Sequence, residues 1–288
     1  YFQLPSTIGT AGQLLKVPSS GNVLEWGTGT GVDRFVDNTA ETLLLGHSNG
    51  PSGTANANTG VGRKSLKLLT EGDNNVGVGN LSGPALTTGL SNVLVGSRSG
   101  QALTTGNYNI AIGDLALNSE DEGNGSVAIG FEALKANDGA MNVAIGREAG
   151  KAIVSGDLNT LVGSNAGISL TSGDSNVAIG DRALRQEDTG SSSVAVGNGA
   201  LSANTTANNN TAVGQIALFS NTTGATNVAV GNNSLDSNST GSNNVGIGSH
   251  ALGGNTTASN NTAVGTDSLK ANTTGTQNVA LGANALDA

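Results

Sequence analysis

The 288-residue chain lacks cysteine and is poor in aromatic and charged residues. It has no Cys, 2% aromatic residues and 11% Asp, Glu, Lys and Arg, whereas an ordinary soluble domain has about 25% charged residues. The absence of cysteine excludes disulfide bonds and thiolate metal sites, and it leaves the redox compartment open. The scarcity of large side chains argues against an ordinary globular core, so the chain needs another source of order.

Basic clusters and long apolar segments are also missing. The formal net charge is −9, and no run of five or more Lys and Arg occurs, so we do not expect nucleic acid as a partner. No stretch of 18 apolar residues exists and the N-terminus has no signal-peptide pattern, so we predict no membrane contact. What the sequence has instead is 45 glycines, together with Val, Ile, Leu and Ala at fixed intervals.

A short string of the form NVAVG recurs along the chain. From Gly62 onwards its spacing is 17 residues, with one step of 16 between Gly130 and Gly146, and in degraded form it extends back to Gly46. A fixed period of this size is typical of a solenoid. We predict an all-β parallel β-solenoid, or β-roll, of about fifteen 17-residue coils in residues 41–288, with strands roughly 4.8 Å apart in a rod of about 70 Å.

Within each string, β-branched residues alternate with a small residue, which predicts a strand with two faces. We assign Val and Ile to the core of the coil and the small residue to a face that another chain can approach closely. The predicted strand core includes Val143, Ile145, Val177, Ile179, Val194, Val196, Val228 and Val230, and the predicted close-packing face includes Ala144, Ala178, Ala195 and Ala229. On this assignment Ile145→Asp disrupts several coils and Thr223→Ala has little effect. The alternative is that Ala faces the interior of its own coil in a monomeric rod.

The second half of the unit has the form xxALxxNTTG. In four units a glycine replaces the leucine, and an apolar residue appears three positions later, at Leu86, Leu103, Ile153 and Leu170. Residues three apart share a face of a helical turn, so we favour a short helical or 3₁₀ turn here over a second strand. The asparagines that open the corner stand in glycosylation sequons, but we interpret them as a hydrogen-bonded ladder between coils; they include Asn204, Asn221, Asn255 and Asn272.

The sequence contains no set of residues that predicts catalysis or metal binding. His47 and His250 are isolated from each other, and the acidic groups at 120–122 and 187–188 fall in corners of the unit. We interpret these acids as solvated rather than as the facing carboxylates of a glycosidase. We therefore predict no catalytic, cofactor or metal site, no cofactor and no enzymatic activity.

The N-terminal part differs from the repeats. Residues 1–3 are interpreted as the remainder of an expression tag, and residues 4–40 as a β-hairpin and connector that precede the repeat region of residues 41–288. The alternation of apolar residues around Leu15, Val17, Val23 and Trp26 predicts the hairpin, with a turn at 18–22.

The strings NVAIG, SVAIG and NTAVG resemble the head repeats of trimeric autotransporter adhesins over residues 58–288. The 17-residue period and the ALxxNTTG insert are more similar to repeats of bacteriophage and algal-virus fibre proteins. The segment GTAGQ…LEWG at 9–27 is similar to segments that precede shafts in phage tail fibres.

This resemblance implies a homotrimeric structural shaft of a viral tail fibre or spike, located on the virion and contributing to host attachment. Its partners would be copies of itself and a host receptor or glycan, bound through this chain or through a tip. The alternatives are the head of a trimeric adhesin on a bacterial surface and a single-chain solenoid that binds glycans or ice.

Overall fold

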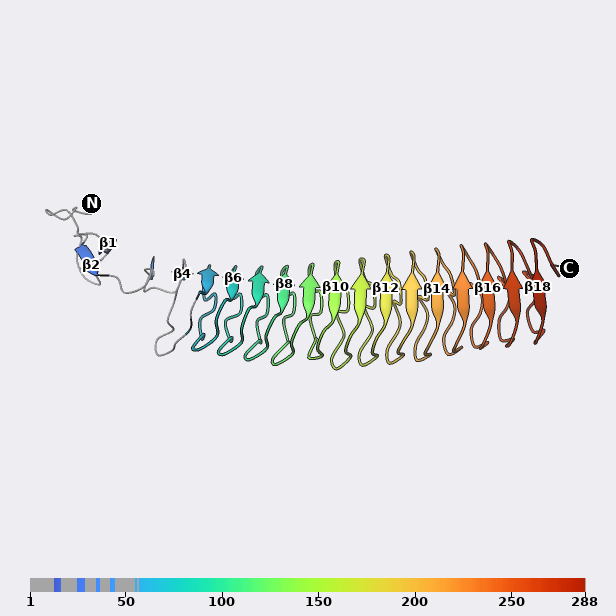
Figure 1. Ribbon diagram of the computed structural model, residues 1–288, viewed down its shortest axis with the longest axis horizontal. Coiled ribbons are helices and arrows are strands. Elements are labelled where there is room, and N and C mark those ends of the chain that lie inside the picture. Colours follow the sequence, from blue (N-terminus) through green and yellow to red (C-terminus); the bar gives the residue numbers. More distant parts are fainter. Residues whose placement is uncertain are drawn as a thin grey trace.

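The computed structural model describes residue 55 and residues 57–287, together with four short strands in the segment before them. Fourteen strands of three residues follow one another along a rod, and each pairs in register and in parallel with the next (Figure 1). They are β5 Thr59–Val61, β6 Val76–Val78, β7 Val93–Val95, β8 Ile110–Ile112, β9 Val127–Ile129, β10 Val143–Ile145, β11 Thr160–Val162, β12 Val177–Ile179, β13 Val194–Val196, β14 Thr211–Val213, β15 Val228–Val230, β16 Val245–Ile247, β17 Thr262–Val264 and β18 Val279–Leu281. The chain is therefore an all-β parallel β-solenoid of about 13 turns, as the repeat predicts.

Two pairs of strands lie before the parallel stack. Strands β1 (Gln13–Lys16) and β2 (Glu25–Thr28) form an antiparallel pair, at the place of the predicted hairpin. Strands β3 (Phe35–Val36) and β4 (Thr42–Leu44) join the large sheet, but β4 runs antiparallel to β5. Parallel stacking thus starts at β5, and the sheet begins inside the predicted connector. Residues 1–3 and the predicted turn at 18–22 lie outside the described residues.

The middle residue of each parallel strand points into the coil, and its two neighbours point outward. Ala144 and Ala178 have no exposed surface, whereas the side chains of Ile145 and Ile179 are about 40% exposed, at 38% and 41%. The predicted assignment of the two faces is therefore wrong, and the alternative that Ala faces its own coil is the one observed. The reversal applies to Val143, Val177, Val194, Val196, Val228 and Val230, which are half-buried and face outward, and to Ala195 and Ala229, which are buried.

The interior of the coil has room only for small and medium side chains. In the five coils of β8, β9, β12, β13 and β14 the mid-strand Ala packs with an Ala-Leu pair from the turn, such as Ala183 and Leu184, and all of these residues are fully buried. A β-branched residue in mid-strand would compete with this leucine for the same space. The larger Val and Ile therefore lie outside, where the coil imposes no such limit.

Two coils in which the mid-strand residue is Leu show how the volume is balanced. Leu161 packs against the glycines that replace the turn leucine in the preceding coil and in its own: a Cβ built on Gly150 would lie 2.8 Å, and one built on Gly167 2.9 Å, from its methyl groups. Leu94 has the same relation to Gly83 in the preceding coil and to Gly100 in its own. The apolar residues that appear three positions after these glycines are also fully buried, as the predicted exchange of anchors requires; they are Leu86, Leu103, Ile153 and Leu170.

The segment after each strand is not helical, so the predicted helical or 3₁₀ turn is wrong for the residues that the structure describes. It is a series of turns in which left-handed residues alternate with right-handed ones, as at Glu132 (φ 55°) and Leu134 (φ 48°). Turn bonds run from the Ala133 N–H to the Gly130 carbonyl at 3.3 Å and from the Asn137 N–H to the Leu134 carbonyl at 3.2 Å, while the Leu134 N–H donates to Ala149 in the next coil at 3.0 Å. Stacking of coils thus replaces the hydrogen bonds that a helix makes within itself.

The glycine that ends each parallel strand is required by its backbone and by the neighbouring coil. Gly180 has φ 135°, and a Cβ built on it would lie 2.5 Å from the carbonyl oxygen of Gly197. We expect Gly180→Ala to lower the free energy of unfolding by about 3 kcal/mol or more, because strain and a backbone clash add.

Chemical denaturation followed by circular dichroism measures this effect. Gly199→Asn is the matched control, since Gly199 has φ 66° with its nearest neighbour at 3.5 Å, and Asn165 and Asn233 hold the same conformation at the equivalent position of other coils. A loss for Gly180→Ala no larger than for this control would contradict the argument.

Candidate functional site

Two columns of asparagine run through the interior of the rod. The first lies at the strand entrance, where the Asn227 N–H donates to Asn210 Oδ1 and the Asn244 N–H donates to Asn227 Oδ1, both at 2.9 Å. The side-chain amide of Asn227 also donates to the Gly241 carbonyl at 2.8 Å. Each asparagine therefore ties three segments of neighbouring coils together inside the protein.

The second column lies at the corner and contains the predicted ladder. Asn221 donates to Asn204 Oδ1 at 2.8 Å, and the ladder continues through Asn238 and Asn255 to Asn272 with distances of 2.9 to 3.1 Å. The predicted hydrogen bonds are present, but they lie in the interior, since Asn204, Asn221 and Asn255 have no exposed surface. Their amide nitrogens are donors in this ladder, so the folded chain does not offer these three sequons for glycosylation.

Two glutamates occupy the corner column in place of asparagine. Glu120 and Glu187 are fully buried, so the prediction that they lie in solvated corners is wrong. Glu120 accepts a hydrogen bond from Asn137, and Glu187 accepts one from Asn204. Burial raises the pKa of Glu120 to about 7 and also raises that of Glu187, against the opposing effect of these hydrogen bonds.

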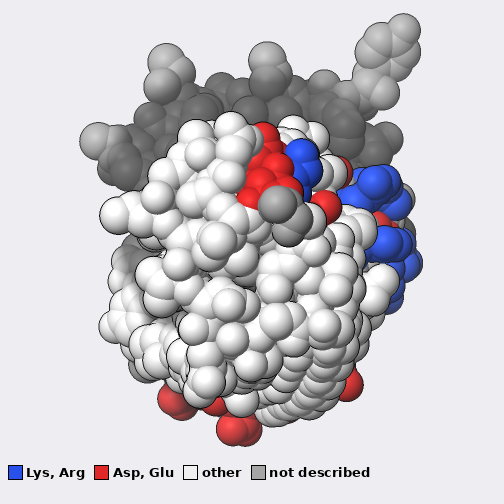
Figure 2. Space-filling view, turned by 90° about the vertical axis from the view of Figure 1, so that its right-hand side faces the viewer, with Lys and Arg blue, Asp and Glu red and all other residues white. Residues whose placement is uncertain are grey.

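Basic side chains gather on one side of the rod. Figure 2 shows the lysines and arginines at the right of the end-on view, apart from the acidic groups at the bottom. In the sequence, every Lys and Arg of the described repeats lies within five residues after a strand glycine: Arg63, Lys64, Lys67, Arg98, Lys135, Arg147, Lys151, Arg182, Arg185 and Lys270.

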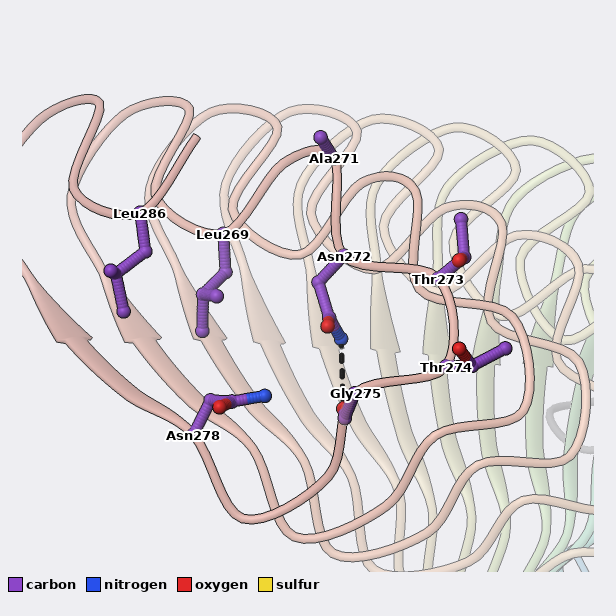
Figure 3. A pocket seen from close by; sticks show the side chains of 8 residues that line it. All are labelled: Leu269, Ala271, Asn272, Thr273, Thr274, Gly275, Asn278 and Leu286. Carbon is purple, nitrogen blue, oxygen red and sulfur yellow. Dashed lines mark hydrogen bonds between the residues drawn. The ribbon is translucent and has the colours of Figure 1, made fainter. Parts of the chain in front are cut away.

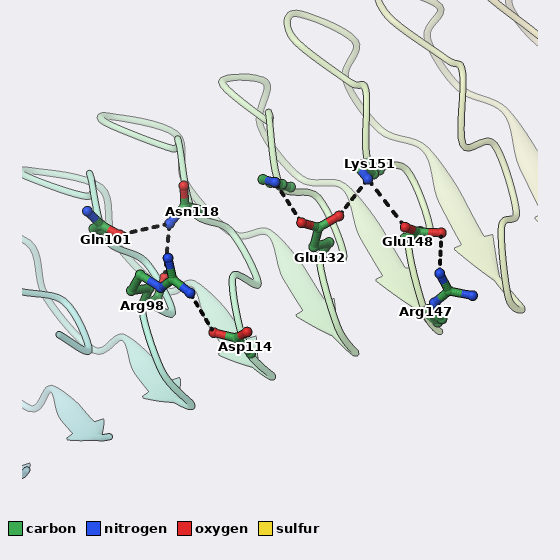
Figure 4. A network of polar contacts seen from close by, with 9 residues as sticks. Arg98, Gln101, Asp114, Asn118, Glu132, Arg147, Glu148 and Lys151 are labelled. Carbon is green, nitrogen blue, oxygen red and sulfur yellow. Dashed lines mark hydrogen bonds and ion pairs between the residues drawn. The ribbon is translucent and has the colours of Figure 1, made fainter. Parts of the chain in front are cut away.

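Two of these side chains, Lys151 and Arg98, bridge neighbouring coils (Figure 4). Lys151 contacts Glu132 in the preceding coil and lies 3.3 Å from Glu148, while Arg98 pairs more loosely with Asp114 at 3.8 Å. Hydrogen bonds from Lys135 and Lys151 lower the pKa of Glu132. The ion pairs of Lys151 and Arg98 join neighbouring coils and neutralise the side chains that take part in them.

Side chains of the types that bind metals do not converge. In the described part of the chain no three His, Asp or Glu side chains form a group that could hold a metal ion, and no helix there could span a membrane. His250 is half-buried near Asp236. Burial raises the pKa of the Asp236 carboxyl, and its electrostatic interaction with His250 opposes this effect. His47 lies outside the described residues.

The aromatic residues of the repeats are exposed but separated. Tyr108 is 65% exposed, Phe131 43% and Phe219 42%, and they stand at different positions of the repeat, before the strand, after its glycine and in the turn. They do not form one platform. The first threonine of the corner, such as Thr205, donates its hydroxyl to the next coil at 3.1 Å, whereas the second, such as Thr206 or Thr223, is exposed.

A hollow of about 390 Å³ lies at the last described coil (Figure 3). Leu269 and Leu286 line one part of it, and Asn272, with its hydrogen bond to the Gly275 carbonyl, and Asn278 line another. These residues belong to the core and to the two asparagine columns, which in every earlier coil are covered by the following turn. The hollow contains no acidic, basic or nucleophilic group beyond the threonines.

The outward side of the parallel strands is an uncharged and largely apolar face. Its outward positions on β5–β18 are Val, Ile, Leu and four Thr, with no charged residue. Ile112, Ile145, Ile179 and Ile247 are 38 to 41% exposed, and stacking in register aligns these positions into two straight rows. At roughly 4.8 Å per strand the rows run for about 60 Å, which is long for an apolar patch on a monomer.

Comparison with known proteins leaves the chain without an assigned family. No protein-family model matches the sequence, and no curated protein is similar to it.

Proposed function

We propose that the chain is the structural shaft of a viral tail fibre or spike, assembled as a homotrimer and contributing to host attachment. The observation that carries this proposal is the uncharged apolar strand face along the whole parallel stack. An apolar face of this length is expected to be buried against another protein surface. Because the face is straight and repeats similar residues in each coil, further copies of the same chain can pack against it along its whole length.

Three further features support a shaft. The coils are joined by backbone hydrogen bonds, two asparagine columns and ion pairs, which together give a stiff rod. The corners and turns present small polar residues without a convergent site. The resemblance of the repeats and of residues 9–27 to fibre proteins points to a virion, whereas a bacterial adhesin head would use the same shaft on a cell surface.

The oligomeric state tests the proposal. We expect light scattering of the purified chain to give three times 28.2 kDa, and Ile179→Asp on the strand face to give the mass of one chain with an unchanged circular dichroism spectrum. Val154→Asp is the matched control, since Val154 is 52% exposed but lies at a corner. A wild-type monomer, or an Ile179→Asp variant that keeps the trimeric mass, would overturn the proposal.

Binding by a single chain is the second candidate, favoured by the row of exposed second threonines at the corners. This row is regular, and its hydroxyls could face a glycan or an ice surface. A wild-type monomer that shows thermal hysteresis, or that is retained on immobilised glycans and loses retention in Thr206→Val with Thr223→Val, would favour this candidate over the shaft.

A further inference from the structure

The charged residues of the repeats are concentrated in one half of the rod. Residues 193–287, which include strands β13 to β18, contain only four Asp, Glu, Lys or Arg residues: Asp236, Asp267, Lys270 and Asp287. All the other charged residues of the described repeats lie in the eight coils from β5 to β12, residues 57–192. At roughly 4.8 Å per strand these coils extend for about 35 Å. We call them the charged half of the rod, and the coils after them the low-charge half.

The two signs of charge lie on different sides of the charged half. The five residues after each strand glycine form the basic side, which carries nine Lys and Arg there but only four Asp and Glu. The segment from the corner to the next strand forms the acidic side, which carries no Lys or Arg there. Its exposed or half-buried acids are Glu71, Asp73, Asp121, Glu122, Asp138, Asp157, Asp174 and Asp188. Figure 2 shows basic groups at the right of the end-on view and acidic groups at the bottom. The charged half is therefore positive on one side and negative on another.

Exposed apolar side chains accompany these charges. Tyr108, Met141 and Leu158 each stand two residues before a strand of the charged half and are 65%, 58% and 55% exposed. Their backbone is left-handed, with φ of 60°, 56° and 60°, although bulky residues rarely take this conformation. The low-charge half has Asn, Thr or Gln at the same position, so the coil itself does not require an apolar residue there. On the basic side, Phe131 is 43% exposed. Tyr, Phe, Met and Arg are enriched in protein interfaces, so both sides have the composition of a contact surface.

A closed three-fold ring joins its copies through two different surfaces. Each copy contacts one neighbour with one side and the other neighbour with another side, so the two sides must fit each other. The basic and acidic sides have opposite charge, extend over the same eight coils and end at the same coil. A three-fold axis along the rod keeps the copies parallel and sets equal coils at one level. The basic side of one copy then faces the acidic side of the next along the whole charged half.

We infer that neighbouring copies of the chain contact each other along β5 to β12, with the basic side of one copy against the acidic side of the next and with equal coils at one level. This inference rests on the proposed homotrimer and adds to it the contact surfaces and the register. The strand face repeats similar residues in every coil, so a copy shifted by one coil would fit it almost as well. Complementary charges are what distinguish the correct alignment from a shifted one. The charged half therefore sets the register of the trimer.

Chemical cross-linking of the wild-type chain tests this contact. A carbodiimide reagent joins a carboxylate and a lysine amine that touch each other as an amide. In trimers assembled from an equal mixture of isotopically light and heavy chains, links between copies appear as mixed-isotope peptides. We expect such links between Lys135 or Lys151 of one copy and Glu122 or Asp138 of another, because equal coils at one level bring these parts of the two sides together.

The outcomes separate this inference from the proposed trimer. A trimeric mass without mixed-isotope links between the basic and the acidic side would overturn the inference and leave the trimer standing. Mixed-isotope links between distant coils, such as Lys67 with Asp174, would overturn the register in the same way. A wild-type monomer would overturn both the trimer and the contact. None of these results depends on how well a variant folds.

Charge reversal tests whether the two sides face each other. One pair of changes, Arg98→Glu with Arg147→Glu, reverses exposed cations of the basic side, and a second pair, Glu122→Lys with Asp138→Lys, reverses exposed carboxylates of the acidic side. Each pair alone places like charges against the neighbouring copy. We therefore expect the trimer to dissociate on dilution at a chain concentration about tenfold or more above that of the wild type. All four changes together restore opposite charges and should restore the wild-type concentration.

Lys270→Glu is the matched control, since it makes the same reversal on the same side of the coil but in the low-charge half, and it should dissociate like the wild type. Light scattering over a dilution series gives the masses, and circular dichroism shows whether the coils remain folded. Wild-type behaviour of both pairs, or a combination as weak as either pair, would show that the basic and acidic sides do not meet.

Discussion

Replacing Ala144 with aspartate is expected to unfold the central coils, whereas the same change at the neighbouring Ile145 is expected to leave them folded. Ala144 has no exposed surface and lies in the continuous core, so its replacement buries a carboxylate with no partner. A buried unpaired charge costs about 3–5 kcal/mol, which is a large part of the stability of most domains. Ile145 is 38% exposed and faces outward, so within one chain we expect a cost of about 1 kcal/mol or less.

Chemical denaturation with hydrogen exchange at β9 to β11 measures both effects. Because coils contact only their neighbours, we expect the loss of protection in Ala144→Asp to centre on these strands. The Ile145→Asp variant should keep its protection and lose only the assembled mass that the proposed trimer requires. Equal destabilisation by the two changes would contradict the observed orientation of the strand.

The strand positions and the stacking of equivalent residues were predictable because they follow from the repeat spacing alone. The 17-residue spacing determines where each strand lies and which residues stack, so the parallel sheet and the hydrogen-bonded asparagines follow without knowledge of side-chain direction. Asn204 and Asn221 are one period apart, and identical side chains at that spacing must meet if the coils are in register. This part of the prediction depends only on the coils stacking in register, and the strands do pair in register.

Side-chain direction was predicted wrongly because hydrophobicity was taken to mark the interior. In a thin coil the limit is volume, and Ala fits where Val does not. The sequence does contain the needed signal: Leu94 and Leu161 are the two mid-strand leucines, and each is adjacent to coils in which glycine replaces the turn leucine. Residues that exchange volume in this way must touch, which places the mid-strand residue inside.

The turn and the buried acids were missed for different reasons. Leu134 and its equivalents adopt a left-handed backbone conformation that leucine rarely takes. Leucine at this position therefore does not predict that conformation. The burial of Glu120 could have been predicted, because it stands one period before Asn137 in the column of the corner ladder. Glutamate is usually exposed, but in a solenoid the position of a residue within the repeat decides whether it is buried.

Leu161→Ala is expected to destabilise the rod by about 3 kcal/mol, because the coils around it cannot refill the space. Leu161 is fully buried between Gly150 and Gly167, neither of which has a side chain to replace it. Removing a buried leucine costs about 2–5 kcal/mol, the larger values applying where a cavity persists. Ala178→Gly is a suitable comparison, since it also truncates a mid-strand residue but leaves Leu184 in place, and it should cost less.

The reciprocal change tests whether the volumes are exchanged between these positions. Gly150→Leu alone should be destabilising, because its Cβ would lie 2.8 Å from a methyl group of Leu161 and 2.9 Å from one of Leu134. Its backbone does not forbid the change, since Gly150 has φ 58° and leucine holds φ 54° at the equivalent Leu184. In the double variant the new leucine can enter the space left by Leu161→Ala, so we expect a favourable coupling of about 1–3 kcal/mol in a double-mutant cycle. A coupling near zero would mean that the two side chains do not share one volume, and the packing scheme of the core would have to be revised.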